Sequence, residues 1–146
     1  TNSYGTDTYV RIKLDELEVY LGYNHTEARN ENSTVRYDLA FNPKDKFSTT
    51  VAYEIESRWR MGIEAAWNGN QVTTGDRKVP NYWFMAAMIQ RNLGKFSFVL
   101  NCENLLDQRQ SRHEVLVTGT NAAPVFSPIW GPVEGRVINL SVKVSW

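Results

Sequence analysis

The C-terminal residues of the chain alternate strictly between apolar and polar side chains. Ile138, Leu140, Val142, Val144 and Trp146 share one parity, and Asn, Ser and Lys residues share the other. An extended strand points successive side chains to opposite faces, so this segment has one apolar and one polar face. A tilted strand of about 9 to 11 residues spans a bilayer and favours an aromatic residue at the interface. The segment therefore predicts a membrane strand or a half-buried soluble strand.

The same period of two recurs in six earlier segments, so the sequence predicts an all-β, antiparallel chain of seven strands. The predicted strands are residues 8–14, 17–24, 47–55, 58–67, 82–92, 96–103 and 136–146. Both faces of residues 82–92 are apolar, so alternation does not assign their sides, and a short helix is conceivable there. The neighbouring segments favour a strand.

Short and long connections alternate along the chain. The tight links are residues 15–16, 56–57 and 93–95, and the long ones are residues 28–45, 68–81 and 108–135. Within the first long connection, residues 35–41 have local strand character. One end of the sheet is therefore expected to carry turns and the other loops, as in outer-membrane barrels. A lipocalin-like soluble barrel can share this asymmetry, and the sequence does not fix which face points inward.

The segment 58–67 separates these alternatives. Its apolar parity begins at Trp59 and ends at Trp67. Eight residues at about 3.3 Å each place the two rings about 26 Å apart along a strand. With tilt, this distance approaches the height of an apolar band bordered by aromatic girdles. Water-facing strands do not need these rings beside Met61 and Ile63, so the pattern favours a membrane strand.

Composition and charge exclude several classes of protein. The 146 residues carry 16 basic and 16 acidic side chains, so no net charge attracts nucleic acid, and no nucleic-acid partner is expected. Cys102 is the single cysteine, so the chain cannot form an internal disulfide framework. No spacing of Cys and His residues resembles a zinc site. The sequence contains no run of about 18 apolar residues, so it predicts no transmembrane helix. The first residues lack the regions of a signal peptide, so we expect the chain to be a piece or to have lost its start.

No arrangement of residues predicts catalysis, and no metal ligand set or cofactor is expected. Glu54 and Glu64 follow no spacing rule for paired carboxylates and have no nucleophile beside them. Ser111, His113 and Glu114 are neighbours in one loop, but triads are defined by geometry rather than by adjacency in the sequence. A solvated loop end is the expected structure there.

The loops hold the candidate ligand-binding residues, because barrels display variable loops that carry recognition. Three prolines within residues 123–132 restrict that stretch, and Phe126 and Trp130 offer ring surfaces for a sugar, a haem or a catechol. Alternatively, these rings pack against neighbouring loops or lie in an aromatic girdle. Candidates for attracting an anionic ligand are Arg77, Lys78, Arg109 and Arg112, although the nearby acids Asp76 and Asp107 balance part of their charge.

Several motifs spread over residues 42–146 carry a family resemblance. They are Asn42-Pro-Lys-Asp-Lys-Phe47, Tyr53-Glu54, Asn104-Leu-Leu-Asp107, Gly135-Arg136 and the terminal Trp146. With them the chain resembles the C-terminal barrel segment of a TonB-dependent outer-membrane receptor from a Gram-negative, Bacteroidetes-like bacterium. In that family, a strand ending in an Asn-Leu-Phe-Asp-like motif precedes a long extracellular loop and a final strand with an aromatic terminus.

The resemblance implies that residues 1–146 form an up-and-down transmembrane β-barrel segment of about seven strands within a 22-stranded barrel. The implied function is energised uptake of a bulky nutrient, namely a ferric siderophore, haem, cobalamin or glycan, and not an enzymatic reaction. The implied partners are outer-membrane lipid, a small-molecule ligand, the TonB complex through a missing N-terminal region, and the barrel-assembly machinery, which would read Trp146.

A self-contained small barrel is the alternative, either a lipocalin-like binding module or a structural outer-membrane protein. Because small membrane barrels have even strand numbers, seven predicted strands favour a segment of a larger barrel.

Overall fold

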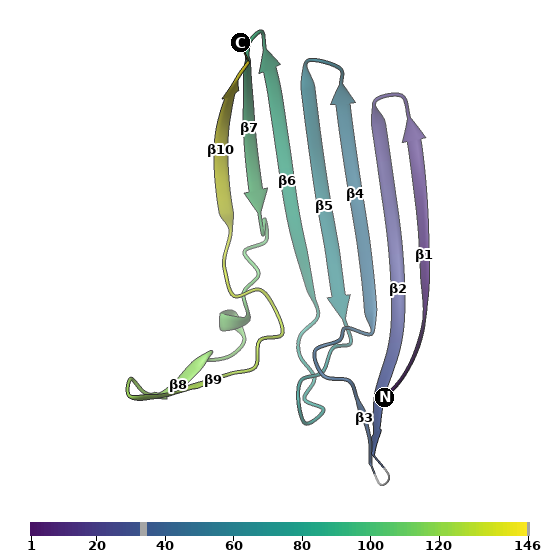
Figure 1. Cartoon of the computed structure of the whole chain (residues 1–146), viewed down its shortest axis with the longest axis vertical. Helices are drawn as coiled ribbons and strands as arrows, with labels where there is room; N and C mark the ends of the chain where they lie inside the picture. The colour runs from purple at the N-terminus through teal and green to yellow at the C-terminus, as the bar shows by residue number, and fades with distance from the viewer. Residues whose placement is uncertain (33–34, 146) are drawn as a thin grey trace.

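The computed structural model describes the backbone of residues 1–32 and 35–145 and the side chains of residues 1–30 and 38–145. Its main element is one antiparallel sheet (Figure 1). In sheet order, the seven main strands are β1 (Asn2–Leu14), β2 (Leu17–Asn32), β4 (Asp45–Ile55), β5 (Trp59–Gly69), β6 (Tyr82–Leu93), β7 (Phe96–Glu103) and β10 (Val137–Val144). The predicted all-β class and the antiparallel arrangement of seven strands are confirmed.

The tight turns lie at one end of the sheet and the long connections at the other, as predicted (Figure 1). Two of the turns require a left-handed backbone, with φ of 60° at Ser57 and 58° at Gly94. Glycine adopts this conformation without steric cost. Ser57 adopts the same left-handed conformation within the three-residue link between β4 and β5.

Three short elements lie outside the main path at the loop end. β3 (Val35–Asp38) pairs with the outer part of β2, and β8 (Val117–Thr120) and β9 (Ala123–Phe126) form a separate hairpin. This hairpin projects sideways beyond β10 (Figure 1). A 3₁₀ turn, η1 (Gln110–Arg112), precedes it.

The prediction of one unbroken connection over residues 28–45 is wrong in its first part. β2 continues to Asn32, because its backbone pairs with the start of β1 on one side and with β3 on the other. Likewise β1 begins at Asn2 rather than at residue 8, since the pairing continues through polar positions such as Gly5 and Thr26. Backbone hydrogen bonds extend these strands past the point where the apolar alternation stops.

The strand register keeps the same parity on one face across the whole sheet. Residues directly opposite in adjacent strands share a face. One complete row of such partners runs Ile12, Val19, Val51, Ile63, Ala87, Cys102, Ile138. This row also assigns the sides of β6, which the sequence left open, because Trp83, Met85 and Ile89 have the parity of Ala87.

The sheet is a single layer, and its few buried side chains lie mostly at the loop end. Val72, Val79 and Trp130 are buried there, whereas the buried apolar residues within the described strands are the small residues Ala28 and Ala65. Among the described residues, β1 and β10 are opposite edges and do not pair with each other or with a further strand. Because the sheet is a single layer, both of its faces are open to the surroundings.

Candidate functional site

A row of aromatic rings crosses the apolar face at the loop end of the strands. Tyr23 of β2 lies opposite Phe47 of β4, Phe47 lies opposite Trp67 of β5, and Trp67 lies opposite Trp83 of β6. Phe47 and Trp83 also meet edge to face, with ring centroids 6.1 Å apart. We call these four residues the aromatic row. Four rings at one level on four adjacent strands match an interfacial girdle.

A second aromatic group marks the turn end of the same face. Trp59 lies opposite Arg91, whose guanidinium carbon is 4.4 Å from the Trp59 ring centroid. Arg91 in turn lies opposite Phe98, which stacks on Phe96 with centroids 6.4 Å apart. A cation beside aromatic rings suits an interface, because the charge reaches water while the rings stay at the apolar boundary.

Between these two levels the face is apolar. In the described strands, this region carries no Asp, Glu, Lys, Arg or His, and Thr49 is its polar member. Its members on the edge strands β1 and β10 are exposed, with Leu140 at 71% and Ile138 at 64%. Soluble monomers rarely expose contiguous apolar patches beyond a few hundred Å². A face spanning seven strands therefore requires an apolar environment or a partner.

Polar groups begin directly beyond the aromatic row. The Asp45 carboxylate accepts hydrogen bonds from the Tyr23 hydroxyl at 2.6 Å and from the Asn70 amide at 2.5 Å, and it lies 2.7 Å from His25 Nδ1. These bonds join β2, β4 and the connection after β5. They satisfy the carboxylate locally and mark the polar edge of the apolar face.

The opposite face of the sheet is polar and mixed in charge. Its charged residues are Asp7, Arg11, Lys13, Glu18, Lys46, Glu54, Arg60, Glu64, Glu103 and Lys143. Arg11 pairs with Glu18 at 2.6 Å and Arg60 with Glu54 at 2.9 Å. The small residues Ala52, Gly62 and Ala86 help line a hollow of about 550 Å³ over β4 to β7. This face suits water or a polar partner.

One loop is organised around the side chain of Gln110, which is fully buried. Its Nε2 donates to Glu114 Oε1 at 2.6 Å and to the Pro128 carbonyl at 2.8 Å, while its Oε1 accepts from the Trp130 backbone N–H at 2.9 Å. The indole Nε1 of Trp130 donates to the same Glu114 oxygen at 2.6 Å. The result is a closed hydrogen-bonded loop core.

Glu114 also connects two loops. Arg77, in the connection between β5 and β6, pairs with Glu114 Oε2 at 2.9 Å. Burial of Glu114 opposes its ionisation, but the hydrogen bonds from Trp130, Gln110 and Arg77 together lower its pKa below the usual range. The carboxylate therefore stays charged and holds the two loops together.

A second junction joins the end of β7 to the start of β10. Asn104 is almost fully buried, and its Nδ2 donates to the carbonyls of Gln108 at 2.8 Å and Glu134 at 3.0 Å. Its Oδ1 accepts from the Gln108 backbone N–H at 2.8 Å. Asn104 has a φ of 49°, a left-handed conformation that Asn tolerates better than most residues.

Asp107 and Arg136 complete this junction. Asp107 Oδ1 accepts the Arg136 backbone N–H at 3.0 Å, and the Arg136 guanidinium donates to the Leu105 carbonyl at 2.6 Å and 3.0 Å. A Cβ on Gly135 would lie 2.6 Å from Asp107 Oδ1, so a larger residue there would require the Asp107 side chain to shift. Residues quoted for the family resemblance, Asn104, Asp107, Gly135 and Arg136, thus meet across a loop of about 30 residues.

Four of the predicted ligand-binding residues lie in different environments. Arg77 and Trp130 are joined through Glu114, whereas an Nη2 of Arg112 pairs with Asp107. Trp130 is 5% exposed, so its ring packs inside the loop and presents no surface to a ligand. Phe126 is 71% exposed on β9. The predicted assembly residue Trp146 lies outside the described residues.

The residues weighed for catalysis do not form a catalytic arrangement in the described structure. Glu114 bonds to Gln110, Trp130 and Arg77, and His113 Nε2 lies 3.3 Å from the side-chain amide of Gln108. Among the described residues, no group of three or more His, Cys, Asp and Glu side chains is placed to hold a metal ion.

Comparisons with known proteins do not identify a family. A scan against protein-family models found no match, and searches of curated proteins and of solved structures found none. None of the described helices is long and apolar enough to cross a membrane.

Proposed function

We propose that this chain is part of the wall of a transmembrane β-barrel in the outer membrane of a Gram-negative bacterium. The carrying observation is the uncharged apolar face bounded by aromatic residues at both ends. Trp59 and Trp67 lie eight residues apart on β5, which corresponds to about 26 Å of strand before tilt. An apolar band of about 25 Å between aromatic girdles is typical of such barrels.

The arrangement of connections and charges supports one orientation. Barrels of this class have short periplasmic turns and longer extracellular loops, so the loop end faces outward from the cell. The polar face with its charged pairs then lines the lumen. Because β1 and β10 are opposite edges, other strands complete the barrel, and a self-contained small barrel is not favoured.

Within this class, a 22-stranded TonB-dependent receptor is the proposed whole protein. Support comes from the resemblance motifs, whose residues Asn104, Asp107, Gly135 and Arg136 form one junction. The chain then supplies wall and loops, while a plug and an N-terminal segment that contacts the TonB complex lie elsewhere. The proposed activity is energised uptake of a ferric siderophore, haem, cobalamin or glycan that the loops help to capture.

Site-specific labelling of cells tests the orientation. Cys102 is replaced by serine, and single cysteines are placed at Thr74 in a loop and at Ser57 in a turn, both of which are exposed. A membrane-impermeant maleimide should label Thr74→Cys in intact cells and Ser57→Cys only after the outer membrane is permeabilised. Equal labelling of both positions in intact cells would contradict the proposal.

A further inference from the structure

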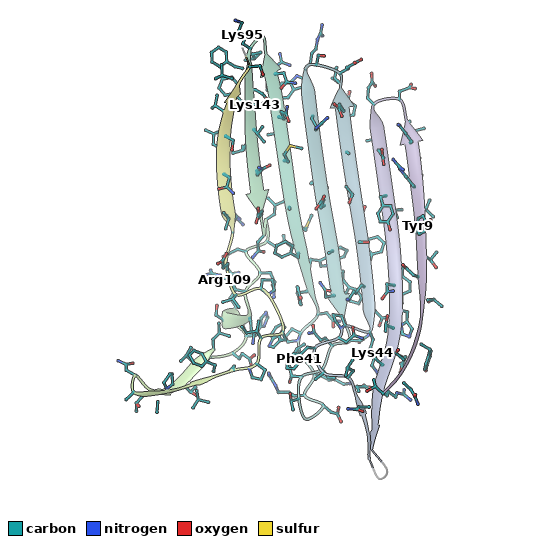
Figure 2. The ribbon with its side chains drawn as sticks, in the orientation of Figure 1. Tyr9, Phe41, Lys44, Lys95, Arg109 and Lys143 are labelled. Carbon is teal, nitrogen blue, oxygen red and sulfur yellow. The ribbon has the colours of Figure 1, made fainter. Side chains whose placement is uncertain are left out.

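Two guanidinium groups, those of Arg109 and Arg112, share the Asp107 carboxylate where β7 and β10 run into the loops, and the Arg136 backbone N–H binds the same carboxylate. We call Arg109, Arg112 and Arg136 the arginine cluster. Nη2 of Arg109 donates to Asp107 Oδ2 at 2.9 Å, and Nη2 of Arg112 donates to the same oxygen. Arg136 reaches the adjacent Leu105 carbonyl. Figure 2 shows Arg109 at the loop end of the molecule, near the ends of these two strands.

The arginine cluster carries more positive charge than its surroundings neutralise. Two guanidinium groups, those of Arg109 and Arg112, pair with one carboxylate, Asp107, which leaves an excess of one positive charge. The Arg136 guanidinium, which is bonded to the Leu105 carbonyl, adds a further positive charge nearby in the chain. Glu134 is near in sequence but forms no ion pair with described residues. The Arg136 backbone N–H, followed by the charges of Arg109 and Arg112, lowers the pKa of Asp107. Since Asp107 is ionised at neutral pH, it is already counted in this excess.

The cluster also keeps unused hydrogen-bond donors. A guanidinium offers five N–H donors. Arg112 forms one side-chain hydrogen bond to the described residues, and its side chain is 51% exposed. Arg109 likewise bonds through one nitrogen, and its Nε is buried without a hydrogen-bond partner in the described structure. Asp107 thus holds both guanidinium groups in place, and the exposed guanidinium of Arg112 has further N–H donors that could bind a ligand.

We propose that the arginine cluster binds the phosphate group of an anionic ligand. Guanidinium forks match phosphate oxygens in a bidentate manner, and several arginines together are the usual way to recognise a phosphate. The level of the site fits either a lipid headgroup or a soluble phosphate ester. Leu105 N bonds to Met85 O, and Met85 is two residues from Trp83 of the aromatic row, so the cluster lies at the polar edge of the apolar face.

The test uses the intact protein in dodecyl maltoside, with inorganic phosphate titrated by calorimetry and phosphatidylglycerol retention followed by native mass spectrometry. Arg112→Gln should weaken binding of the phosphate group about tenfold or more, because one charged donor group is lost. Arg112→Lys should keep part of the affinity. Arg11→Gln is the matched control, since Arg11 pairs with Glu18 on the polar face of β1 and β2, away from the loops, and the phosphate affinity of this variant should equal that of the unaltered protein.

The two ligands distinguish the sources of phosphate. Binding of inorganic phosphate that depends on Arg112 indicates a soluble phosphate ligand, whereas Arg112-dependent retention of phosphatidylglycerol without phosphate binding indicates a lipid headgroup. The lipid source rests on the proposed membrane function, but phosphate binding does not, so a failure of membrane labelling leaves it standing. Absence of both activities, or equal activities in Arg112→Gln protein with an unchanged melting temperature, would overturn the proposal.

Discussion

The sheet exposes apolar side chains, whereas the loop end buries polar ones. In the sheet, apolar residues such as Leu140 are exposed, whereas in the loops the polar residues Gln110, Asn104 and Thr73 are nearly or fully buried. Backbone pairing holds the strands together, and their apolar side chains need no protein core if lipid surrounds them. The loops instead depend on side-chain hydrogen bonds. The two regions therefore differ in the solvent to which each is adapted.

A charged substitution on the apolar face should destabilise the protein more than any other change considered below. Ile63 lies midway between Trp59 and Trp67, and Ile63→Arg should destabilise the protein by about 2 to 4 kcal/mol in a bilayer, because arginine is costly at the midplane. Urea unfolding of the intact protein in lipid vesicles measures this loss. The control Glu64→Arg changes the adjacent residue on the polar face and should cost much less. Equal losses for the two variants would count against two different faces.

Removal of the buried amide of Asn104 should have the next largest effect, confined to the loop end. Asn104→Ala leaves the Gln108 N–H and two carbonyls without their partner, at a cost of about 1 to 3 kcal/mol. Hydrogen exchange should increase in residues 108–135 and stay unchanged in β4 and β5. The surface variant Asn121→Ala is the control. Unchanged exchange in the loop would show that the junction does not hold it.

The link between the two loops is expected to be weaker, because Arg77 is half exposed. Arg77→Ala and Glu114→Gln should each loosen the loops, and their double-mutant cycle should give a coupling of about 0.2 to 1 kcal/mol. Hydrogen exchange of residues 70–81 and 108–135 provides the free energies. A coupling near zero would mean that the loops are held independently.

The smallest expected effect is a pH dependence of the loop at Asp107. Its pKa is lower in the folded protein than in the unfolded chain, so its contribution is present above the unfolded pKa of about 3.9 and is lost as pH falls through the folded value. Exchange in residues 108–135, corrected for the intrinsic rate, should therefore rise only below about pH 4. Asp107→Asn should remove this additional acid dependence. A rise between pH 5 and 7 would contradict the assignment.

The sequence predicts the sheet better than the loops for a physical reason. Strand faces follow from a local period of two, so the sides of β5 and β7 are readable from residues such as Trp59 and Phe98. The sides of β6 required its register with β5, because both of its faces are apolar. The ends of β1 and β2 depend on backbone pairing, which the apolar pattern does not record.

The loop networks depend on contacts between residues far apart in the chain. Trp130 and Phe126 looked equivalent in the sequence, yet one is buried against Glu114 and the other is exposed. No pattern in the sequence around Gln110 predicts that its side chain is buried. Asn104 and Asp107 were noticeable as a motif, but their bonds to the backbone of Glu134 and Arg136 appear only in three dimensions.

Contact of the apolar face with lipid is the central claim, and a spin-label scan along β5 tests it most directly. With Cys102 replaced by serine, single labels at positions 60 to 66 in bilayers are exposed in turn to oxygen and to a water-soluble nickel chelate. We expect a period of two, with oxygen reaching Met61, Ile63 and Ala65 and the chelate reaching Arg60, Gly62 and Glu64. Equal chelate access at both parities would contradict a lipid-facing sheet.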